Sequence, residues 1–259
     1  MKLISNFNWY GTYMLSVREI RRFLKVYHQT LIAPVISALI FLSIFSLALG
    51  DENKKIHNIP YKDFAGYGLI IMTIIQNSFA NSSSSLIMAK VIGYINDILM
   101  PPFDGKELVL AYNVGSITRG IVVGILLAFV LSFIIEMRLH SLLLMIYYVF
   151  TAAMLLANLG LLSSLITDNF DQNSAITSYI ITPLSFLSGT FYSIHQLPLW
   201  FKMLNLINPF FYIIDGFRYS LIGTSDGNIM AGIIYILILN LCILILVIKI
   251  IDSGWKLKQ

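Results

Sequence analysis

Residues 188–212 read SGTFYSIHQLPLWFKMLNLINPFFY, which is too apolar for an ordinary loop and too interrupted for a membrane-spanning helix. Gly189, Pro198 and Pro209 break the run, and His195 and Lys202 place polar groups inside it. Broken backbone at membrane depth is tolerated only where protein or a water-filled cavity shields its N–H and C=O groups. The stretch therefore predicts a membrane protein that contains a shielded, irregular segment.

The composition of the whole chain also indicates a membrane protein. Of the 259 residues, 58% are apolar and only 12% are charged, and the mean hydropathy is +0.81. A soluble domain carries about 25% charged residues, so this chain is too poor in charge to cover a water-facing surface. Its single cysteine, Cys242, rules out an internal disulfide framework, and its four histidines are too scattered for a metal site. The net charge of +4 gives no reason to expect a nucleic-acid partner.

Six apolar segments are candidate membrane-spanning helices, because about 20 apolar residues are needed to cross a bilayer. They cover residues 29–50, 64–88, 108–135, 142–166, 175–191 and 229–251. We find no convincing internal repeat. The predicted fold is a single all-α membrane domain over residues 1–259, with both termini on the same side of the membrane.

The distribution of Lys and Arg predicts the orientation of the chain. The side that holds the termini carries ten of these residues and the opposite side carries six, while Arg119 lies inside a span. Cytosolic segments hold the excess of positive charge in membrane proteins. We therefore expect a multi-pass protein of the cytoplasmic (inner) membrane with cytosolic N- and C-termini.

Residues 1–28 predict an amphipathic interface helix. At about 100° per residue, six apolar residues share one narrow face: Trp9, Tyr13, Val17, Ile20, Leu24 and Tyr27. Four basic residues point the other way: Arg18, Arg21, Arg22 and Lys25. Such a helix lies flat in the headgroup layer, with its cations toward anionic lipids. The alternative is an ordinary charged flank of the first span.

Residues 193–228 predict a re-entrant helical hairpin on the outer face, between the fifth and sixth spans. A seventh span over 196–217 would place Lys202 and Asp215 in hydrocarbon, at up to about 2.5–3.5 kcal/mol each near the centre. A helix over 197–207, a turn at Asn208-Pro209 and a second helix over 210–222 avoid that cost. Asp215 and Arg218 are three residues apart on the second helix, which predicts that they pair.

The loop over 89–107 predicts a short amphipathic helix on the cytosolic side. Apolar residues from Val91 to Leu99 follow helical spacing, Asn96 and Asp97 are polar, and Pro101-Pro102 ends the helix. A helix of this kind fits the groove of a partner protein. The alternative is a helix that rests on the membrane surface.

The second span is unusually polar, with Gln76, Asn77, Asn81 and the serines 82–85. Small polar residues allow close helix packing and hydrogen bonds between helices, which is the interpretation we favour. The alternative is that they line a substrate path. Arg119 in the third span is interpreted as an anchor whose side chain extends to the cytosolic headgroups.

Motifs for ATP hydrolysis and for hydrolase chemistry are missing. Gly105-Lys106 is followed by Glu107 and lacks the earlier glycine of a phosphate-binding loop, and neither H-E-x-x-H nor G-x-S-x-G occurs. The chain itself is therefore not expected to be an enzyme.

Several segments resemble one known family, the type-2 permeases of ABC transporters. They are VREIRRF (17–23), LIAPVISAL (31–39), QNSFANSSSSL (76–86), KVIGYINDILMPPF (90–103), FLSGTFYSIHQLP (186–198) and NPFFYIIDGFRY (208–219). Pro209, Tyr212 and Arg218 have the spacing of that family's signature, and the resemblance covers nearly the whole chain. One departure is Asp104, where a serine is expected.

The resemblance implies a six-span permease that works as a homodimer, with an ABC ATPase subunit docked under each copy. ATP and Mg would then be bound by the ATPase, and this chain would hold no cofactor. The loop helix would be the coupling helix that contacts the ATPase through Lys90, Gly93, Tyr94, Asn96, Asp97 and Leu99. The hairpin would be the outer gate, formed by Leu197, Pro198, Trp200, Asn208, Pro209, Tyr212, Asp215 and Arg218.

Members of the family export polysaccharides, lipid-linked glycans, lipo-oligosaccharides or hydrophobic drugs, so the resemblance implies export of an amphipathic or lipid-linked substrate. The alternatives are an ion-driven secondary transporter and a non-transporting membrane scaffold. A secondary transporter predicts inverted repeats and carboxylates near the middle of the membrane. The carboxylates here lie in predicted loops or near the ends of spans.

Overall fold

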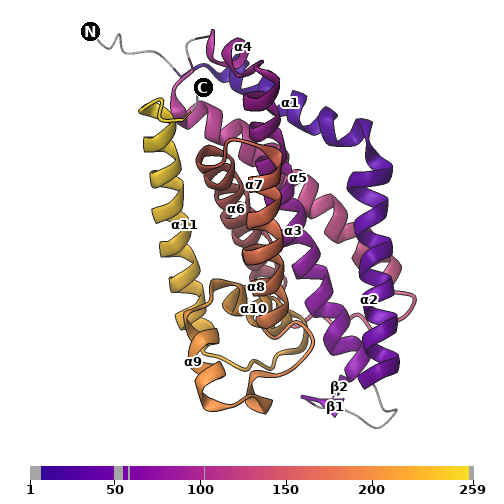
Figure 1. Cartoon of the computed structure of the whole chain (residues 1–259). Coiled ribbons are helices and arrows are strands. Elements are labelled where there is room, and N and C mark those ends of the chain that lie inside the picture. The colour runs from indigo at the N-terminus through magenta and orange to yellow at the C-terminus, as the bar shows by residue number, and fades with distance from the viewer. Residues whose placement is uncertain (1–6, 50–54, 58, 102, 257–259) are drawn as a thin grey trace.

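The computed structural model describes residues 7–49, 55–57, 59–101 and 103–256, and most of them are helical (Figure 1). Residues 1–6 of the predicted interface segment and Pro102 of the predicted loop lie outside the described residues. The elements in chain order are α1 (Trp9–Lys25), the π-helix η1 (His28–Ile32), α2 (Ala33–Leu49), β1 (Lys55–Ile56), β2 (Ile59–Pro60), α3 (Tyr61–Ile92), α4 (Ile95–Leu99), α5 (Gly105–Leu131), α6 (Leu142–Ile166), α7 (Phe170–Ile176), the π-helix η2 (Thr177–Ile181), α8 (Thr182–Leu187), the 3₁₀-helix η3 (Ile194–Gln196), α9 (Leu199–Ile207), α10 (Pro209–Ile222) and α11 (Ile229–Asp252).

Four of the described helical segments are long and apolar enough to span a membrane, namely His28–Ala48, Gly105–Leu131, Leu142–Ile166 and Ile229–Asp252. They correspond to the first, third, fourth and sixth predicted spans, and they confirm an all-α, multi-pass protein. The helix at the second predicted span, α3, is longer than any of them, but its Gln, Asn and Ser residues lower its hydropathy. At the fifth, α7, η2 and α8 form one helical run over 170–187.

The two π-helices have a common cause in the sequence. Each ends two residues before a proline, η1 before Pro34 and η2 before Pro183. Proline has no N–H to donate to the preceding turn, and its ring crowds the carbonyl four residues back. The wider π turn accommodates this defect, so both helices continue through their prolines.

Helix α3 is the centre of the bundle and contacts α2, α5, α6 and α10. Small residues bring the neighbours close to it. A Cβ atom on Gly120 of α5 would lie 2.0 Å from the Ser78 Oγ, and one on Gly160 of α6 would lie 2.2 Å from the Ser82 Oγ. These contacts support the packing interpretation for the serines of the second span.

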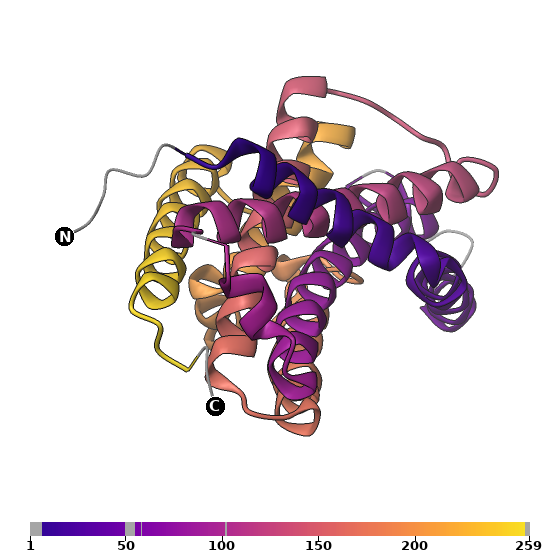
Figure 2. The same cartoon turned by 90° about the horizontal axis from the view of Figure 1, so that it is seen from above.

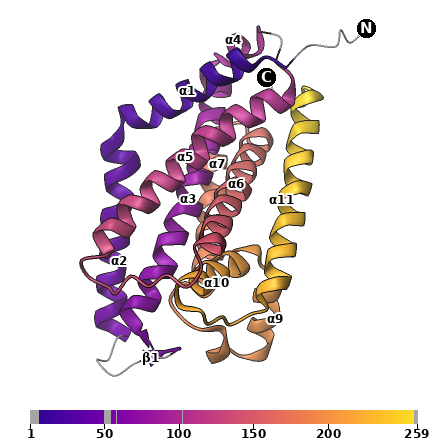
Figure 3. The ribbon, with the colours of Figure 1, turned by 180° about the vertical axis from the view of Figure 1, so that it is seen from behind.

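The two ends of the bundle carry different elements. The described chain ends, α1 and α4 lie at one end, and the β1–β2 hairpin and α9 lie at the other (Figures 1 and 3). Seen from above, α1 lies across the first of these ends rather than along the bundle (Figure 2). Both described chain ends thus lie on the same side, as an even number of crossings requires.

Candidate coupling and gating sites

The loop between α3 and α5 projects from the end of the bundle that holds the chain ends (Figure 1). α3 stops at Gly93, whose φ of 92° lies in the left-handed region that favours glycine, and a Cβ atom there would meet nothing within 4 Å. α4 then buries Ile95 and Ile98 and leaves Asn96 and Asp97 exposed. The predicted amphipathic helix is therefore short, and it starts after a glycine break.

The predicted coupling residues fall into two groups. Tyr94 and Leu99 are half-buried beside the exposed Asn96 and Asp97 of α4. These four residues therefore lie at the protein surface. Lys90 is only 5% exposed, and its ammonium donates to the carbonyl oxygens of Ser164 at 2.9 Å and Thr167 at 2.6 Å. It caps the end of α6, where backbone carbonyls lack helical partners. Lys90 therefore does not belong to the exposed surface on which the sequence placed it.

An open groove of about 430 Å³ separates α4 from α1. It is lined by Asn8, Tyr10, Gly11, Met14, Leu15, Arg18, Asp97, Ile98, Pro101 and Phe103. The Arg18 guanidinium lies 5.8 Å from the centroid of the Tyr94 ring, which is within the range of a cation–π contact. The groove therefore combines apolar walls with one basic and one acidic side chain.

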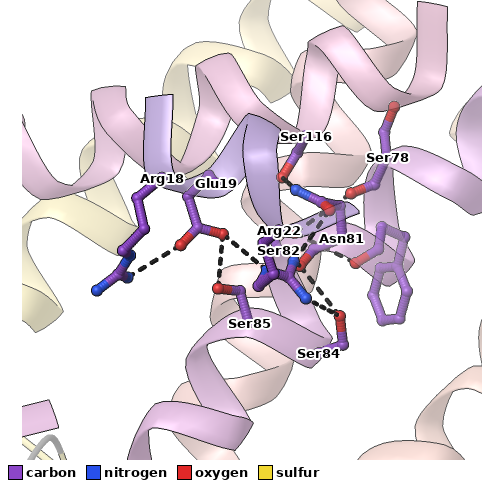
Figure 4. Close-up of polar contacts among 10 residues, drawn as sticks. Arg18, Glu19, Arg22, Ser78, Asn81, Ser82, Ser84, Ser85 and Ser116 are labelled. Carbon is purple, nitrogen blue, oxygen red and sulfur yellow. Dashed lines mark hydrogen bonds and ion pairs between the residues drawn. The ribbon is translucent and has the colours of Figure 1, made fainter. Parts of the chain in front are cut away.

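A buried polar cluster joins α1 to α3, and we call it the α1–α3 cluster (Figure 4). Its members are Glu19 and Arg22 of α1 and Asn81, Ser84 and Ser85 of α3. Glu19 is fully buried and accepts from Ser85 Oγ at 2.6 Å and from Arg22 Nε at 3.2 Å. Arg22 Nη2 donates to both the backbone and the side-chain oxygen of Asn81, at 2.8 and 2.9 Å. The cluster fixes the rotation and the position of α1 against α3.

Helix α1 is amphipathic, but only some of its basic residues point away from the protein as predicted. Arg21 and Lys25 are exposed. Arg18 is exposed as well, although its guanidinium pairs with Glu19 at 2.9 Å, whereas Arg22 is half-buried and pairs with Glu19 at 3.2 Å. The buried acid draws Arg22 inward, because a fully buried carboxylate needs opposite charge and hydrogen bonds.

The cluster extends to α5 and reaches Arg119. Asn81 Nδ2 donates to Ser116 Oγ at 3.2 Å, and Arg119 Nη2 donates to Asn77 Oδ1 at 3.1 Å. Arg119 is 9% exposed and does not extend to the headgroups, which corrects that expectation. It lies near the middle of α5, about 21 Å from the start of the helix, so it finds a partner on α3 instead. Its anchoring role is that of a link between α3 and α5.

A cavity of about 420 Å³ lies between α2, α3 and the η2–α8 run. Its lining includes Gln29, Ser37, Phe41, Met72, Thr73, Gln76, Asn77, Thr177, Thr182 and Phe186. Asn81, Ser82 and Ser85, one to two turns further along α3, are buried in helix contacts instead. Helix packing is therefore confirmed for Asn81, Ser82 and Ser85, whereas Gln76 and Asn77 line a cavity, and a substrate path through it stays a prediction.

At the opposite end of the bundle, the chain breaks between α9 and α10 at Asn208-Pro209, as predicted. Asn208 has an extended ψ of 116°, which the following proline favours. Its Oδ1 accepts from the N–H of Phe210 at 3.0 Å, and its Nδ2 donates to Ser188 Oγ at 2.8 Å. Pro209 is the first residue of α10, where a missing N–H costs nothing. Asn208 thus caps α10 and ties it to the segment after α8.

The two helices of the predicted hairpin differ in exposure. On α9, Trp200 is 64% exposed, and Pro198 before it is also exposed. α10 packs against α3, α6 and α11. Its Tyr212 is half-buried, with its ring centroid 5.2 Å from that of Tyr235. Leu197, just before α9, is half-buried as well. These residues therefore belong to an exposed apolar helix, α9, and to a buried helix next to it, α10.

Asp215 and Arg218 do not form the ion pair that their spacing predicted. Asp215 accepts from the backbone N–H groups of Asp226 and Gly227, at 2.8 and 2.9 Å. Arg218 donates to the carbonyl oxygen of Gly189 at 2.8 Å, and its guanidinium lies 3.6 Å from the centroid of the Phe64 ring. Each charge therefore satisfies backbone groups of a different loop rather than the other charge.

Asp226 forms hydrogen bonds that connect three segments at the end of the bundle that holds α9. Its carboxylate accepts from His57 Nε2 at 2.7 Å, from Ser193 Oγ at 2.8 Å and from the N–H of Ile194 at 2.9 Å. Burial alone would raise the pKa of Asp226, but these hydrogen bonds and the nearby Arg218 outweigh it and lower the pKa. The β1–β2 hairpin, the segment before α9 and the loop before α11 are thus held together by one carboxylate.

Glu19, His57 and Asp226 were not predicted as site residues from the sequence. Glu19 is the one acid on a basic helix, between Arg18 and Arg22, and that contrast was a usable signal. His57 and Asp226 are 169 residues apart, and no local pattern indicates such a pair.

Comparison with known proteins adds to this geometry. The family model of the ABC-2 type transporter matches residues 10–222, from α1 to the end of α10. The chain belongs to this family. The inner membrane transport permease YadH of Escherichia coli K12 is 30% identical over 251 residues, which cover 97% of this chain and 98% of YadH. YadH of Shigella flexneri matches to the same extent.

Membership in the ABC-2 family determines the class of protein. This chain is a transport permease and not an enzyme, because ATP hydrolysis in such transporters belongs to a separate subunit. The matched range includes the α1–α3 cluster, the cavity, the Asn208-Pro209 break and, apart from Asn8, the lining of the α1–α4 groove. All of these features therefore lie within the ABC-2 permease domain.

Proposed function

We propose that this ABC-2 permease is the membrane subunit of an ATP-driven exporter that pairs with a second copy of itself and moves an amphipathic or lipid-linked substrate out of the cytoplasm. The observation that supports this proposal is the mixed lining of the cavity between α2, α3 and α8. Gln76 and Asn77 give it amide groups, while Phe41 and Phe186 give it apolar walls. A wholly apolar cargo would leave the amides unpaired, and a wholly hydrophilic cargo would gain nothing from the rings.

The ATPase subunit docks at the α1–α4 groove and against the exposed Asn96 and Asp97. α3 then links this surface to the cavity, because α4 follows directly on α3 and Gln76 lies on the same helix. About 24 Å of continuous helix separates Gln76 from Ile92. A movement of α4 that shifts the end of α3 beside Gly93 is therefore transmitted along α3 to the cavity wall.

In the membrane, the end of the bundle that holds α1 and α4 faces the cytosol. At the opposite end, α9 and α10 form a re-entrant hairpin that serves as the outer gate. The exposed apolar side chains of α9, including Trp200, Met203 and Ile207, support its contact with lipid. The break at Asn208-Pro209 gives the hairpin its turn.

The test is substrate flux in vesicles that contain the permease and its ATPase. Gln76→Leu removes an amide from the cavity wall, and Gln172→Leu on the exposed surface of α7 is the matched control. We expect Gln76→Leu to keep ATPase binding and to lower flux by at least about fivefold, since one lost hydrogen bond costs about 1 kcal/mol. Flux that needs an ion gradient and no ATPase would refute the proposal. Equal flux in both variants would show that the cavity is not part of the substrate path.

A further inference from the structure

The cavity between α2, α3 and the η2–α8 run is polar at one end and apolar at the other. Its lining extends along α3 from Leu69 to Ala80, and eleven residue steps make about 17 Å of helix. The lining at the end toward α1 includes Gln29, Gln76, Asn77 and Thr177. The lining at the end toward the β1–β2 hairpin includes Phe41, Leu69 and Phe186 (Figure 1). An amphiphile in this cavity therefore lies with its headgroup toward α1.

A buried cation lies directly behind the polar end of the cavity. Arg119 of α5 is 9% exposed, and its Nη2 donates to the Oδ1 of Asn77 at 3.1 Å. Its Nε has no hydrogen-bond partner, and no carboxylate of the described residues lies within ion-pair distance of its guanidinium. Glu19 of the α1–α3 cluster is shared by Arg18 and Arg22, so that cluster has no negative charge to spare. The charge of Arg119 is therefore not neutralised within the described part of the chain.

The structural link between α3 and α5 does not by itself explain this charge. A neutral amide at position 119 would donate the same single hydrogen bond to Asn77. A cation at membrane depth is costly, and such residues mark a functional site by default. Arg119 lies near the middle of α5, where an opposite charge has to come from a ligand.

Asn77 connects Arg119 to the cavity. The Oδ1 of Asn77 accepts from the guanidinium, and its Nδ2 donates one of its two hydrogens to the carbonyl oxygen of Thr73 at 2.9 Å. The second hydrogen has no acceptor among the described residues. Hydrogen bonds in a chain polarise one another, so the bond from Arg119 makes this amide a stronger donor.

The rest of the lining does not oppose a negative charge. No residue that lines the cavity is acidic. Gln76 lines it beside Asn77, and its side chain forms no hydrogen bond within the described residues. The polar end therefore offers unpaired amide donors with one positive charge behind them, which favours an anionic acceptor over a neutral one.

We propose that the cavity takes an amphiphile with an anionic headgroup, and that Arg119 selects this charge through Asn77. The headgroup lies at Gln76 and Asn77, and the aliphatic part lies beside Phe41 and Phe186. The inference rests on the proposed function, because it specifies the substrate class of the same cavity.

The experiment measures equilibrium binding to the purified full chain in phosphatidylcholine nanodiscs, without an ATPase. The two probes are dodecyl phosphate and dodecylphosphocholine, which share one aliphatic chain and differ in the net charge of the headgroup. Ser37→Trp fills the cavity, and Ser43→Trp is its matched control, because Ser43 is exposed on the same helix and does not line the cavity. A thermal melt of each variant checks that it is folded.

Three further variants test the charge itself. Arg119→Gln removes the cation, and Arg119→Lys keeps one at the same position. Asn77→Asp places a carboxylate beside the guanidinium and neutralises it from within the protein, so it decides the question even if Arg119→Gln does not fold. Arg21→Gln, which removes an exposed cation on α1, is the control.

We expect the unchanged chain to bind dodecyl phosphate about tenfold more tightly than dodecylphosphocholine, which corresponds to about 1.4 kcal/mol. Ser37→Trp should weaken the binding of both probes. Arg119→Gln and Asn77→Asp should remove only the preference between them. Arg119→Lys, Arg21→Gln and Ser43→Trp should keep the preference.

No preference in the unchanged chain, or a preference that persists in Asn77→Asp, would overturn the proposal. Binding of dodecyl phosphate that Ser37→Trp leaves unchanged would place the anion site elsewhere and would also overturn it. A failed flux assay in vesicles, with the tenfold preference intact, would refute the proposed export and would support the anion-selective site.

Discussion

The α1–α3 cluster predicts that Arg22 is a major determinant of stability, whereas its neighbour Arg21 is not. Arg22→Ala removes two hydrogen bonds to Asn81, one to Glu19 and one to Ser84. Hydrogen bonds to charged groups contribute about 1.5–3 kcal/mol each, but the Arg22 side chain is 26% exposed, so water replaces part of the loss. We expect a net loss of about 2 kcal/mol in the free energy of unfolding. Glu19 then remains buried with only Ser85 and Arg18 as partners.

The assay is thermal unfolding of the purified protein in detergent. About 2 kcal/mol corresponds to a decrease in Tm of about 4–8 °C for a chain of this size. Arg21→Ala, an exposed arginine on the same helix, should change Tm by no more than about 1–2 °C. A double-mutant cycle of Arg22→Ala with Asn81→Ala should give a coupling energy of about 1 kcal/mol. Equal melting of the two arginine variants, together with additive effects in the cycle, would refute the assignment.

Three further outcomes are expected. Asn208→Ala should destabilise the protein by about 1–2 kcal/mol, because it removes the cap of α10, while Pro209→Ala should cost less than about 1 kcal/mol; chemical unfolding that ranks them in the reverse order would contradict this. Asp226→Asn should lower stability at pH 7. Because the folded state lowers the pKa of Asp226, the contribution of its carboxylate to stability is present above pH ~4 and is lost as the pH falls further. If Asp226→Asn lowers stability by the same amount at pH 3 as at pH 7, the charge of Asp226 is not involved. In a cysteine-free background, Thr224→Cys should react with an impermeant thiol reagent in sealed cells and Asp97→Cys should not, and labelling of the latter would reverse the orientation.

Local features of the sequence were sufficient to predict the broken segment. Proline restricts the residue before it and lacks a donor, so Asn208-Pro209 had to separate two helices, and the structure has α9 and α10 on either side of it. The four apolar spans could be predicted equally well, because composition over about 20 residues decides whether a helix can enter a bilayer. These predictions depend on neighbouring residues only.

The partners of the charged side chains could not be predicted in the same way. The i, i+3 spacing of Asp215 and Arg218 indicated a pair, yet each contacts a loop that folds back over α10. Lys90 was placed on an exposed helix face, but the end of α6 lies beside it and takes its three donors. Spacing along one helix says nothing about which other element covers that helix.

Four charged residues of this permease share one pattern, which affects how substitutions in them must be interpreted. Lys90, Arg218, Asp215 and Asp252 each bond to backbone groups at the end of another element rather than to an opposite charge. Where water is scarce, unpaired N–H and C=O groups are costly, and a charged side chain satisfies several at once. Loss of transport in Asp215→Ala would therefore follow from unfolding of the loop before α11 as readily as from a damaged outer gate. A gating role requires a variant that lowers flux while its Tm and its ATPase binding stay unchanged, and α9, whose apolar residues are exposed and bear no such bonds, is the element on which to seek it.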